Sequence, residues 1–406
     1  MEYEEILEMD EVRNLERPTS GEILSSKELE ESTSEKEYPD AIVFESSGTT
    51  GKPKRIPYSE EILDKQREHE SKAFKIGGLA EHDTVMTLAA PLTSISGWAS
   101  RSGSRKLGAE VLNRSFNDYK KVIESKEDKD VTAIFATPLV AKTIGEEIEN
   151  EYGSPKDIFP NLRIGFMFGD LLPDSLEKDL KRQWGFQELR CLYGTVEADV
   201  IAIEESESGM LIPMLDRIVI EIIPYENGKK QDRIRDIRDL DRKMKGSILI
   251  TDPLRKKVSI SRYEIGDMIR VHPDDPVPKI EVLGRIDNTI NLGGAPLHEK
   301  DLQKAIDDTY GMHVETWKVI VTRENSKPAI DVYIAGDIDE KRNEFLNNLF
   351  ETAPPVKEAY SDIGNGVIEH INLSMVDDQE EITKDIEIDK IENDAKSERI
   401  IFSESF

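Results

Sequence analysis

The sequence predicts an α/β protein in which a large N-terminal domain of layered helices and strands precedes a small α+β C-terminal domain. Between residues 40 and 193, short apolar runs alternate with amphipathic segments of roughly a dozen residues, which is typical of strands that alternate with helices. From about residue 200 to 284, strand-like runs are separated only by Gly, Pro or Asp turns, which indicates a β-rich subdomain. We expect the N-terminal domain to span residues 1–284 and the C-terminal domain residues 285–406.

The individual elements can be placed in chain order from the same periodicities. Residues 1–40 are rich in Glu and Ser, and we expect short helices and loops there that cover the start of the fold. Before residue 200 the expected strands are 40–44, 84–90, 132–137, 162–168 and 188–193, and the expected helices are 59–74, 115–124, 141–151 and 176–184. The β-rich subdomain should contain strands at 217–224, 246–252, 268–271 and 279–283. In the C-terminal domain we expect helices at 299–310 and 340–353, strands near 317–322, 329–335 and 369–375, and an acidic, mobile tail from residue 377.

Composition and charge exclude several classes of protein. The 406 residues include 54 Lys or Arg and 83 Asp or Glu, and the resulting net charge of −29 disfavours binding to nucleic acid or to an anionic membrane surface. No apolar run reaches the roughly 18 residues of a spanning helix, and the acidic N-terminus lacks the features of a signal peptide. The single cysteine, Cys191, excludes an intramolecular disulfide. We therefore expect a soluble, cytoplasmic protein.

The most informative local sequence is the loop at residues 45–54, which reads ESSGTTGKPK. Its two glycines allow tight turns that present backbone N–H groups, and its four hydroxyls and two lysines add donors and positive charge. This combination predicts a cradle for a polyphosphate, although a polar loop with incidental lysines is the alternative for this segment alone. A Walker P-loop is excluded, because only two residues separate Gly48 from Gly51 and Pro53 replaces the magnesium-binding Ser or Thr.

Segment 46–54 closely resembles the phosphate-binding signature of the adenylate-forming superfamily, which includes acyl-CoA synthetases, peptide-synthetase adenylation domains and luciferases. Further matches to this family follow in the expected order along the chain. They are CLYGTVE at 191–197, RYEIGD at 262–267, GRIDNTINLGG at 284–294, and the strand and loop at 162–170. The resemblance runs from about residue 41 to the C-terminus. It is nearest to phenylacetate-CoA-ligase-like members, which share this loop and a short N-terminal region.

The resemblance implies a role for each matched residue. It assigns nucleotide binding to Ser46, Ser47, Gly48, Thr49, Thr50, Gly51, Lys52, Lys54, Tyr193, Gly194, Thr195, Asp267 and Arg285. Glu197 would act in catalysis by holding Mg²⁺, and Asp267 would accept hydrogen bonds from the ribose hydroxyls, since a carboxylate is acceptor-only. Asp287 would be the hinge between the domains. Gly293 and Gly294 would lie in the loop on the thiol side of the C-terminal domain.

The catalytic lysine of the family has no obvious counterpart, because no Gly-Lys pair occurs after residue 230. The segment AKSERII at 395–401 resembles the family's Gly-Lys-x-x-Arg-Val-Ile variant, with Ala in place of Gly. We therefore assign the catalytic lysine to Lys396, with Lys390 and Lys384 as the alternatives.

Three further positions depart from the family pattern. Val196 and Ile265 each replace a threonine, and Asn291 replaces a frequent lysine. Val196 removes a hydroxyl donor at the reacting phosphate, and a lost hydrogen bond to a charged partner costs on the order of 1–3 kcal/mol.

The resemblance implies an enzyme that uses ATP and Mg²⁺ to convert a carboxylic acid to an acyl-adenylate, releases pyrophosphate, and then transfers the acyl group to CoA. Two alternatives stay open: transfer to a carrier-protein thiol or a non-acyl acceptor, and a degenerate nucleotide-binding module without activity. The acid itself is not readable, although Trp98 is a candidate for the wall of the acyl pocket. Because only 44 residues precede the loop, a shortened first subdomain would expose apolar surface, which favours a homodimer.

Overall fold

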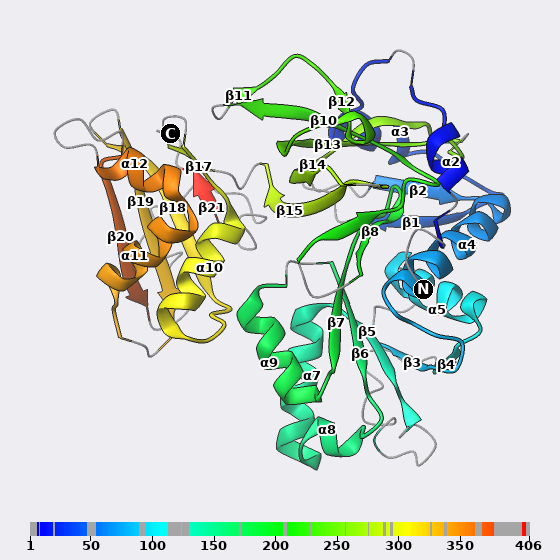
Figure 1. Ribbon diagram of the computed structural model, residues 1–406, viewed down its shortest axis with the longest axis horizontal. Helices are drawn as coiled ribbons and strands as arrows, with labels where there is room; N and C mark the ends of the chain where they lie inside the picture. The colour runs from blue at the N-terminus through cyan, green and yellow to red at the C-terminus, as the bar shows by residue number, and fades with distance from the viewer. Residues whose placement is uncertain are drawn as a thin grey trace.

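In the computed structural model, one long sheet runs through residues 84–285 and a smaller sheet through residues 317–402 (Figure 1). The structure describes residues 6–7, 9–18, 21–46, 54–88, 95–112, 123, 130–169, 172–205, 209–226, 229–255, 257–274, 276–286, 290–292, 295–324, 327–336, 339–361, 368–376 and 400–402. Among these residues, thirteen strands form the large sheet and four form the smaller one. The predicted α/β class is confirmed.

The first half of the large sheet is parallel and has the strand order β4-β3-β5-β6-β7. Its strands are β3 (Thr84–Thr87), β4 (Glu110–Leu112), β5 (Ala133–Ala136), β6 (Ile164–Phe168) and β7 (Glu188–Thr195). Helices cover both faces: α4 (Glu60–Ile76) and α5 (Ile95–Leu107) lie on one side, and α7 (Pro138–Tyr152), α8 (Pro155–Ile158) and α9 (Asp174–Trp184) on the other (Figure 1). Strands covered on both faces read as continuous apolar runs, which is why they were visible in the sequence.

Each face of the parallel half has its own apolar core. On the α4 side, the rings of Phe74 and Phe135 are 4.8 Å apart and those of Phe135 and Phe166 are 4.5 Å apart. On the α9 side, the ring of Trp184 lies 6.0 Å from those of Phe159 and Phe186. Because successive strand residues point to opposite faces, neighbouring residues of β5 and β6 contribute to different cores.

Helix α5 has no counterpart among the predicted elements, because its many small residues hide the helical period. These small residues allow close packing instead. A Cβ on Gly103 would lie 2.6 Å from Glu70 Cβ and from the Phe74 ring, so α5 approaches α4 more closely than a larger residue would permit. The predicted helix at 115–124 lies outside the described residues, apart from Ile123.

The second half of the large sheet is antiparallel and continues directly from β7 through β8. Its strands are β8 (Asp199–Glu204), β9 (Leu211–Pro213), β10 (Val219–Glu226), β11 (Lys229–Lys230), β12 (Arg235–Asp236), β13 (Met244–Asp252), β14 (Ile260–His272) and β15 (Lys279–Arg285). Strand β14 starts well before the predicted 268–271. Its first part was missed because register irregularities against β13 and β15, and positive φ angles at Arg262 (47°) and Gly266 (93°), interrupt the apolar alternation.

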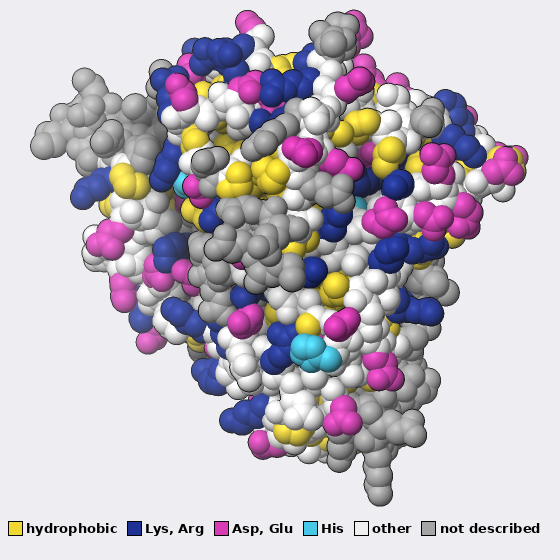
Figure 2. Space-filling view, turned by 45° about the vertical axis from the view of Figure 1, so that its right-hand side comes forward, with side chains coloured by type: hydrophobic (Ala, Val, Ile, Leu, Met, Phe, Trp, Pro, Cys, Tyr) yellow, Lys and Arg dark blue, Asp and Glu magenta, His cyan; other side chains and the backbone are white. Residues whose placement is uncertain are grey.

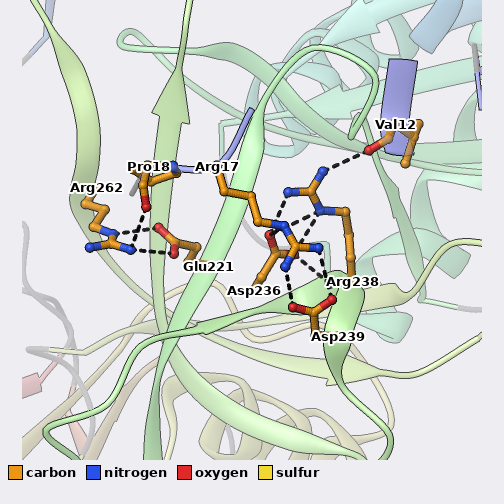
Figure 3. Close-up of polar contacts among 8 residues, drawn as sticks. All are labelled: Val12, Arg17, Pro18, Glu221, Asp236, Arg238, Asp239 and Arg262. Atoms are coloured by element: carbon orange, nitrogen blue, oxygen red, sulfur yellow. Dashed lines mark hydrogen bonds and ion pairs between the residues drawn. The ribbon is translucent and has the colours of Figure 1, made fainter. Parts of the chain in front are cut away.

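Ion pairs and hydrogen bonds hold the N-terminal segment, residues 9–18, against this antiparallel region (Figure 3). Arg17 pairs with Asp236 at 3.2 Å and with Asp239, and Arg262 donates to Glu221 at 2.9 and 3.0 Å and to the Pro18 carbonyl at 3.1 Å. The elements between residues 9 and 58 are α2 (Met9–Asn14), α3 (Ser26–Thr33), β1 (Ile42–Ser46) and β2 (Lys54–Tyr58), and β1 and β2 pair antiparallel. Short helices and loops therefore cover the start of the fold, as predicted.

The C-terminal part has a sheet and a core of its own. Its elements are β16 (Ile290–Leu292), β17 (Ala295–Leu297), α10 (Glu299–Tyr310), β18 (Trp317–Glu324), β19 (Lys327–Ala335), α11 (Arg342–Thr352), α12 (Pro354–Ser361), β20 (His370–Val376) and β21 (Ile400–Phe402). Its apolar core consists of described residues from Ile290 onward and shares none with the other two cores. The expectation of a wholly mobile tail is wrong at its end, because β21 pairs in parallel with β18.

Polar contacts join the C-terminal part to the large sheet's helices and strands. Ser175 of α9 donates to Asp307 of α10, Lys142 of α7 pairs with Glu315, and Lys300 donates to Glu281 at 2.8 Å. On the face shown in Figure 2, basic and acidic side chains are interspersed. No helix within the described ranges combines the length and apolarity needed to cross a bilayer.

Asp83 ties together the starts of three parallel strands. It is 1% exposed, and its carboxylate accepts hydrogen bonds from Arg163 Nε at 3.0 Å, Thr132 Oγ1 at 2.7 Å and the Ala80 N–H at 2.7 Å. Burial alone would raise the pKa of Asp83, but the bonds from Arg163 and Thr132 outweigh it and lower the pKa below the ordinary value. The stabilisation is therefore complete at neutral pH and is lost as the pH falls through that lowered pKa.

We predict that Asp83→Asn destabilises the large part by about 1–3 kcal/mol at pH 7, since it leaves Arg163 without its ionic partner. Calorimetric melting should show this loss, and the gap from the unmodified chain should narrow below about pH 4 as Asp83 itself becomes protonated. Asp64→Asn is the control, because its pair with Arg67 is exposed and should change stability by less than about 1 kcal/mol. Equal effects of the two substitutions at pH 7 would contradict the prediction.

Candidate functional site

A cleft of about 1110 Å³ lies between the large sheet and α10. The carboxyl ends of parallel strands form part of its wall, which is the usual location of ligand sites in open α/β sheets. The wall includes Phe135, Thr137, Phe168 and Gly169 at these ends, Tyr193–Thr195 at the end of β7 with Val196 after it, Ile265, Asp267 and Arg285 from β14 and β15, and Lys300, Gln303, Lys304 and Asp307 from α10. The cleft thus brings together the motifs at 191–197, 262–267 and 284–294.

A buried ion pair joins the phosphate-loop motif to the motif at residues 191–197. Lys54 Nζ lies 2.8 Å from Glu197 Oε1 and donates to the Tyr263 hydroxyl at 2.7 Å, and that hydroxyl donates to the same Glu197 oxygen at 3.0 Å. Burial alone would lower the pKa of Lys54, but Glu197 and Tyr263 together raise it above the ordinary lysine value. Lys54 is therefore a cation at neutral pH, although its side chain is only 13% exposed.

Tyr193, Asp267 and Arg285 form a second polar cluster, which lines the cleft. The Tyr193 hydroxyl donates to Asp267 Oδ2 at 2.6 Å, and Arg285 Nη1 donates to Asp267 Oδ1 at 3.1 Å and to the Ile265 carbonyl at 2.8 Å. Burial and the negative charge of Asp267 raise the pKa of Tyr193 well above its ordinary value, so its hydroxyl stays protonated. Asp267 is held by one neutral donor and one cation, and it keeps lone pairs for further donors.

The turn between β7 and β8 places Glu197 next to the cleft. Thr195 Oγ1 accepts a hydrogen bond from the Ala198 N–H at 3.3 Å, and the Val196 carbonyl accepts one from the Tyr58 hydroxyl at 2.8 Å. Gly194 lies where the β7–β8 register shifts, and a Cβ there would be 2.3 Å from the Asp199 carbonyl oxygen. The glycine of this motif is therefore required by a close approach of backbone.

Several predicted site residues lie outside the described residues. Ser46 ends β1 directly opposite Lys54, so the two ends of the phosphate loop are paired, but the Ser46 side chain is not described. The other predicted residues outside the described ranges are Ser47, Gly48, Thr49, Thr50, Gly51, Lys52, Asp287, Gly293, Gly294 and Lys396. Their roles stay predictions.

The sequence analysis missed two features of this site. Tyr263 was part of a quoted motif but received no role, since its contact with both Lys54 and Glu197 depends on the register of β14. The apolar wall formed by α4 and α5 was also missed, together with α5 itself. Trp98 is not among the described residues lining the cleft: its ring lies 6.5 Å from that of Phe44 and under the guanidinium of Arg67.

The fold and this site define a mixed α/β protein with a partly polar, partly apolar cleft, and the comparisons with known proteins identify its family. The family model described as "AMP-binding enzyme" matches residues 3–218, and the chain belongs to this family. Phenylacetate-coenzyme A ligase of Pseudomonas putida is 22% identical over 71% of this chain and 64% of its own length. The same enzyme of Escherichia coli is 23% identical over 65% of this chain and 59% of its own length. The chain thus spans less than two thirds of these curated relatives.

Solved structures show the same fold. A 2-hydroxyisobutyryl-CoA ligase in the postadenylation state superposes with a TM-score of 0.66 at 14% identity, covering 95% of this chain and 80% of that one. ATP-bound MatB from Rhodopseudomonas palustris superposes with a TM-score of 0.58 at 16% identity, covering 83% of this chain and 64% of that one.

We predict that Gly194→Ala lowers the melting temperature of the large part, because the added methyl group would overlap backbone that cannot move aside. Overpacking of this kind costs about 1–3 kcal/mol. Gly209→Ala is the control: an added Cβ there meets no atom within 4 Å, although the φ of Gly209 is 66°. Gly209→Ala should lower the free energy of unfolding by only about 1–2 kcal/mol, which is the cost of a left-handed backbone conformation for a non-glycine residue. A larger loss in Gly209→Ala than in Gly194→Ala would show that the close approach is not the constraint.

Proposed function

We propose that this protein is an AMP-forming acid–thiol ligase, which activates a carboxylic acid with ATP and transfers the acyl group to CoA. The observation that carries the proposal is that the Tyr193–Asp267–Arg285 cluster lines the cleft, while the buried Lys54–Glu197–Tyr263 cluster adjoins it through Glu197, which follows the lining residue Val196. The first matches a site for a ribose and the second a site for phosphates. The relatives' names support the choice of CoA as acceptor.

The two clusters would bind different parts of ATP. Asp267 would accept the ribose hydroxyls, with Tyr193 and Arg285 fixing its orientation. The loop from Ser46 to Lys54 would surround the β- and γ-phosphates with hydroxyl, backbone N–H and lysine donors. These donors would stabilise the negative charge that develops on the departing pyrophosphate.

Glu197 fits the role of a magnesium ligand. It is 2% exposed, and one of its two carboxylate oxygens accepts both described hydrogen bonds, from Lys54 and Tyr263. No group of three or more His, Cys, Asp or Glu side chains within the described residues could hold a metal. A single carboxylate suits Mg²⁺, which takes one or two protein carboxylates and completes its shell with phosphate oxygens and water. When bound, Mg²⁺ would neutralise negative charge on the phosphates. Lys54, which lies beside Glu197, would contribute positive charge to the same phosphates.

The reaction would proceed in two steps. In the first, a carboxylate oxygen of the acid attacks the α-phosphorus of ATP, a new O–P bond forms, and the bond to pyrophosphate breaks. In the second, the thiol sulfur of CoA bonds to the acyl carbon, its proton is lost, and AMP leaves. Lys396 would bridge the carboxylate and the α-phosphate in the first step. We propose that the parts 1–284 and 285–406 are domains that rotate about Asp287 between the steps, which would bring Gly293 and Gly294 to the thiol side.

The polar contacts between the two parts support such a rotation, because breaking them exposes no shared apolar core. A homodimer and a cytoplasmic location also remain proposals. Within the described surface, the large apolar side chains that are exposed are Ile42 in β1, Tyr152 in α7 and Met312 after α10.

ATP–pyrophosphate exchange with a panel of carboxylic acids, followed by discharge with CoA, tests the proposal directly. Acid-dependent exchange and CoA thioester formation are expected. Exchange without discharge by CoA would indicate a carrier-protein thiol or another acceptor. ATP binding without exchange would favour the degenerate nucleotide-binding module, and absence of both exchange and ATP binding would contradict the proposal altogether.

We predict that Glu197→Gln slows pyrophosphate exchange by about tenfold or more, because an amide lacks the charge that a hard cation requires. Even residues that only support a metal ligand typically contribute about 10–100-fold. Higher Mg²⁺ concentrations should restore part of the rate. Glu226→Gln is the control, since Glu226 forms an exposed pair with Arg233 away from the cleft. Unchanged exchange in Glu197→Gln, with the fold intact by circular dichroism, would mean that the metal ligand is misassigned.

We predict that Lys396→Ala lowers the adenylation rate on the order of 10²–10³-fold, as expected for loss of one charge-stabilising donor in a transition state. ATP affinity and conversion of pre-formed acyl-adenylate to thioester should change little, because the lysine acts only in the first step. Lys390→Ala and Lys384→Ala are controls from the same acidic tail. If one of these loses adenylation while Lys396→Ala keeps it, the tail is misaligned with the family.

A further inference from the structure

The cleft has a mainly apolar part. Its wall there consists mainly of side chains from α4, α5, β5 and β6: Phe74, Ile95, Ser96, Ala99, Ser100, Phe135 and Phe168. Asp199, the first residue of β8, lines the same cleft with only 5% of its surface exposed. A charged group in such a place is costly unless a partner compensates it.

The Asp199 side chain is held firmly in position. Gln66 Nε2 of α4 donates to Asp199 Oδ2 at 2.6 Å, which links the start of β8 to the helix that carries Phe74. The backbone of Asp199 has a φ of 58°, a left-handed conformation that non-glycine residues adopt rarely and at a cost. Gly194 makes this conformation possible by leaving space for the Asp199 carbonyl.

The nearby cations are committed to other carboxylates. Arg217 donates to Asp252 at 2.8 Å, and Lys72 donates to Asp216 at 2.9 Å. Within the described part of the chain, Asp199 forms no ion pair with any Lys, Arg or His.

The second acidic group beside Asp199 is Glu70. Glu70 is fully buried, and burial together with the charge of Asp199 raises its pKa well above the ordinary value. Ser102 Oγ donates to Glu70 Oε2 at 2.8 Å. A carboxylate can accept about four hydrogen bonds, and the described side-chain hydrogen bond to Asp199 comes from Gln66. Acceptor capacity is therefore left for a donor in the cleft.

We propose that the acid activated by this protein carries a hydrogen-bond donor on its acyl chain, either a hydroxyl or an amino group, and that Asp199 accepts it. The inference rests on the proposed function and adds the substrate class. An acid with a purely apolar chain would leave the remaining acceptor capacity of Asp199 unused in the cleft. Sites built to hydrogen-bond a substrate group discriminate strongly against analogues that lack the group, because the unpaired polar group is then stranded.

The test measures ATP–pyrophosphate exchange with two matched sets of acids, phenylacetate with its 4-hydroxy and 4-amino derivatives, and isobutyrate with its 2-hydroxy and 2-amino derivatives. We expect kcat/KM for a donor-bearing acid to exceed that of its parent by about tenfold or more in at least one set. Preference for the amino derivative would identify an ammonium group as the donor. Preference for the hydroxy derivative would identify a neutral hydroxyl as the donor.

Asp199→Asn isolates the carboxylate, because Asn tolerates the left-handed backbone and can still accept from Gln66. The preference for the donor-bearing acid should fall at least about tenfold, while exchange with the parent acid should change little. Asp331→Asn, the same change in β19 outside the cleft, should leave the preference unaltered. If Asp199→Asn fails to fold, the comparison of acids with the unmodified chain decides alone.

The outcomes separate the inference from the function on which it rests. If no acid supports exchange, the proposed function fails. If parent acids react as well as their donor-bearing partners, or if Asp199→Asn slows all acids equally, the enzyme stands and the role of Asp199 is refuted.

Discussion

The ion pair between Lys54 and Glu197 is the contact on which the arrangement of the site depends. Lys54 comes from the hairpin of β1 and β2, Glu197 from the turn after the parallel half, and Tyr263, which bonds to both, from the antiparallel half. Three regions far apart in the sequence are thus joined through one buried set of hydrogen bonds. Breaking one member of such a set leaves a charge buried without its partner, which is far more costly than losing an exposed pair.

The N-terminal segment before Ser26 supports the Lys54–Glu197 ion pair through its contacts with the antiparallel strands. The contacts of Arg17 and Arg262 hold the chain before Leu24 against the antiparallel strands, and Leu24 itself exchanges backbone hydrogen bonds with Arg262 and Glu264 at 3.1 and 2.9 Å. These bonds flank Tyr263, and Ser26, two residues after Leu24, accepts from Lys54 at 3.3 Å. The short N-terminal region therefore positions the residues of the candidate site as well as covering the fold.

Much of this architecture was predictable from the sequence, and the exceptions have physical causes. Strands buried on both faces, such as β5 and β6, appear in the sequence as apolar runs. Helix α10 is visible because its apolar residues recur at helical spacing. Helix α5 was missed because its small residues serve close packing rather than periodicity. Among the predicted site residues, Tyr193 and Asp267 are joined by a hydrogen bond, and Glu197 pairs with Lys54; the roles that the resemblance gave them stay predictions. The resemblance could not reveal that Asp199 lines the cleft, because that depends on a register shift and a left-handed residue rather than on a residue pattern.

The separate core of the C-terminal part has a thermodynamic consequence. Cooperative unfolding couples regions that share buried apolar contacts, and the described contacts named between these two parts are polar. Under the proposed domain division, heat should denature the chain in two transitions rather than one, and a single free energy of unfolding would then not be defined for the whole molecule. A substitution in the core around Trp317 would shift only the transition of its own part, so a calorimetric trace alone can assign a destabilising change to one of the two parts.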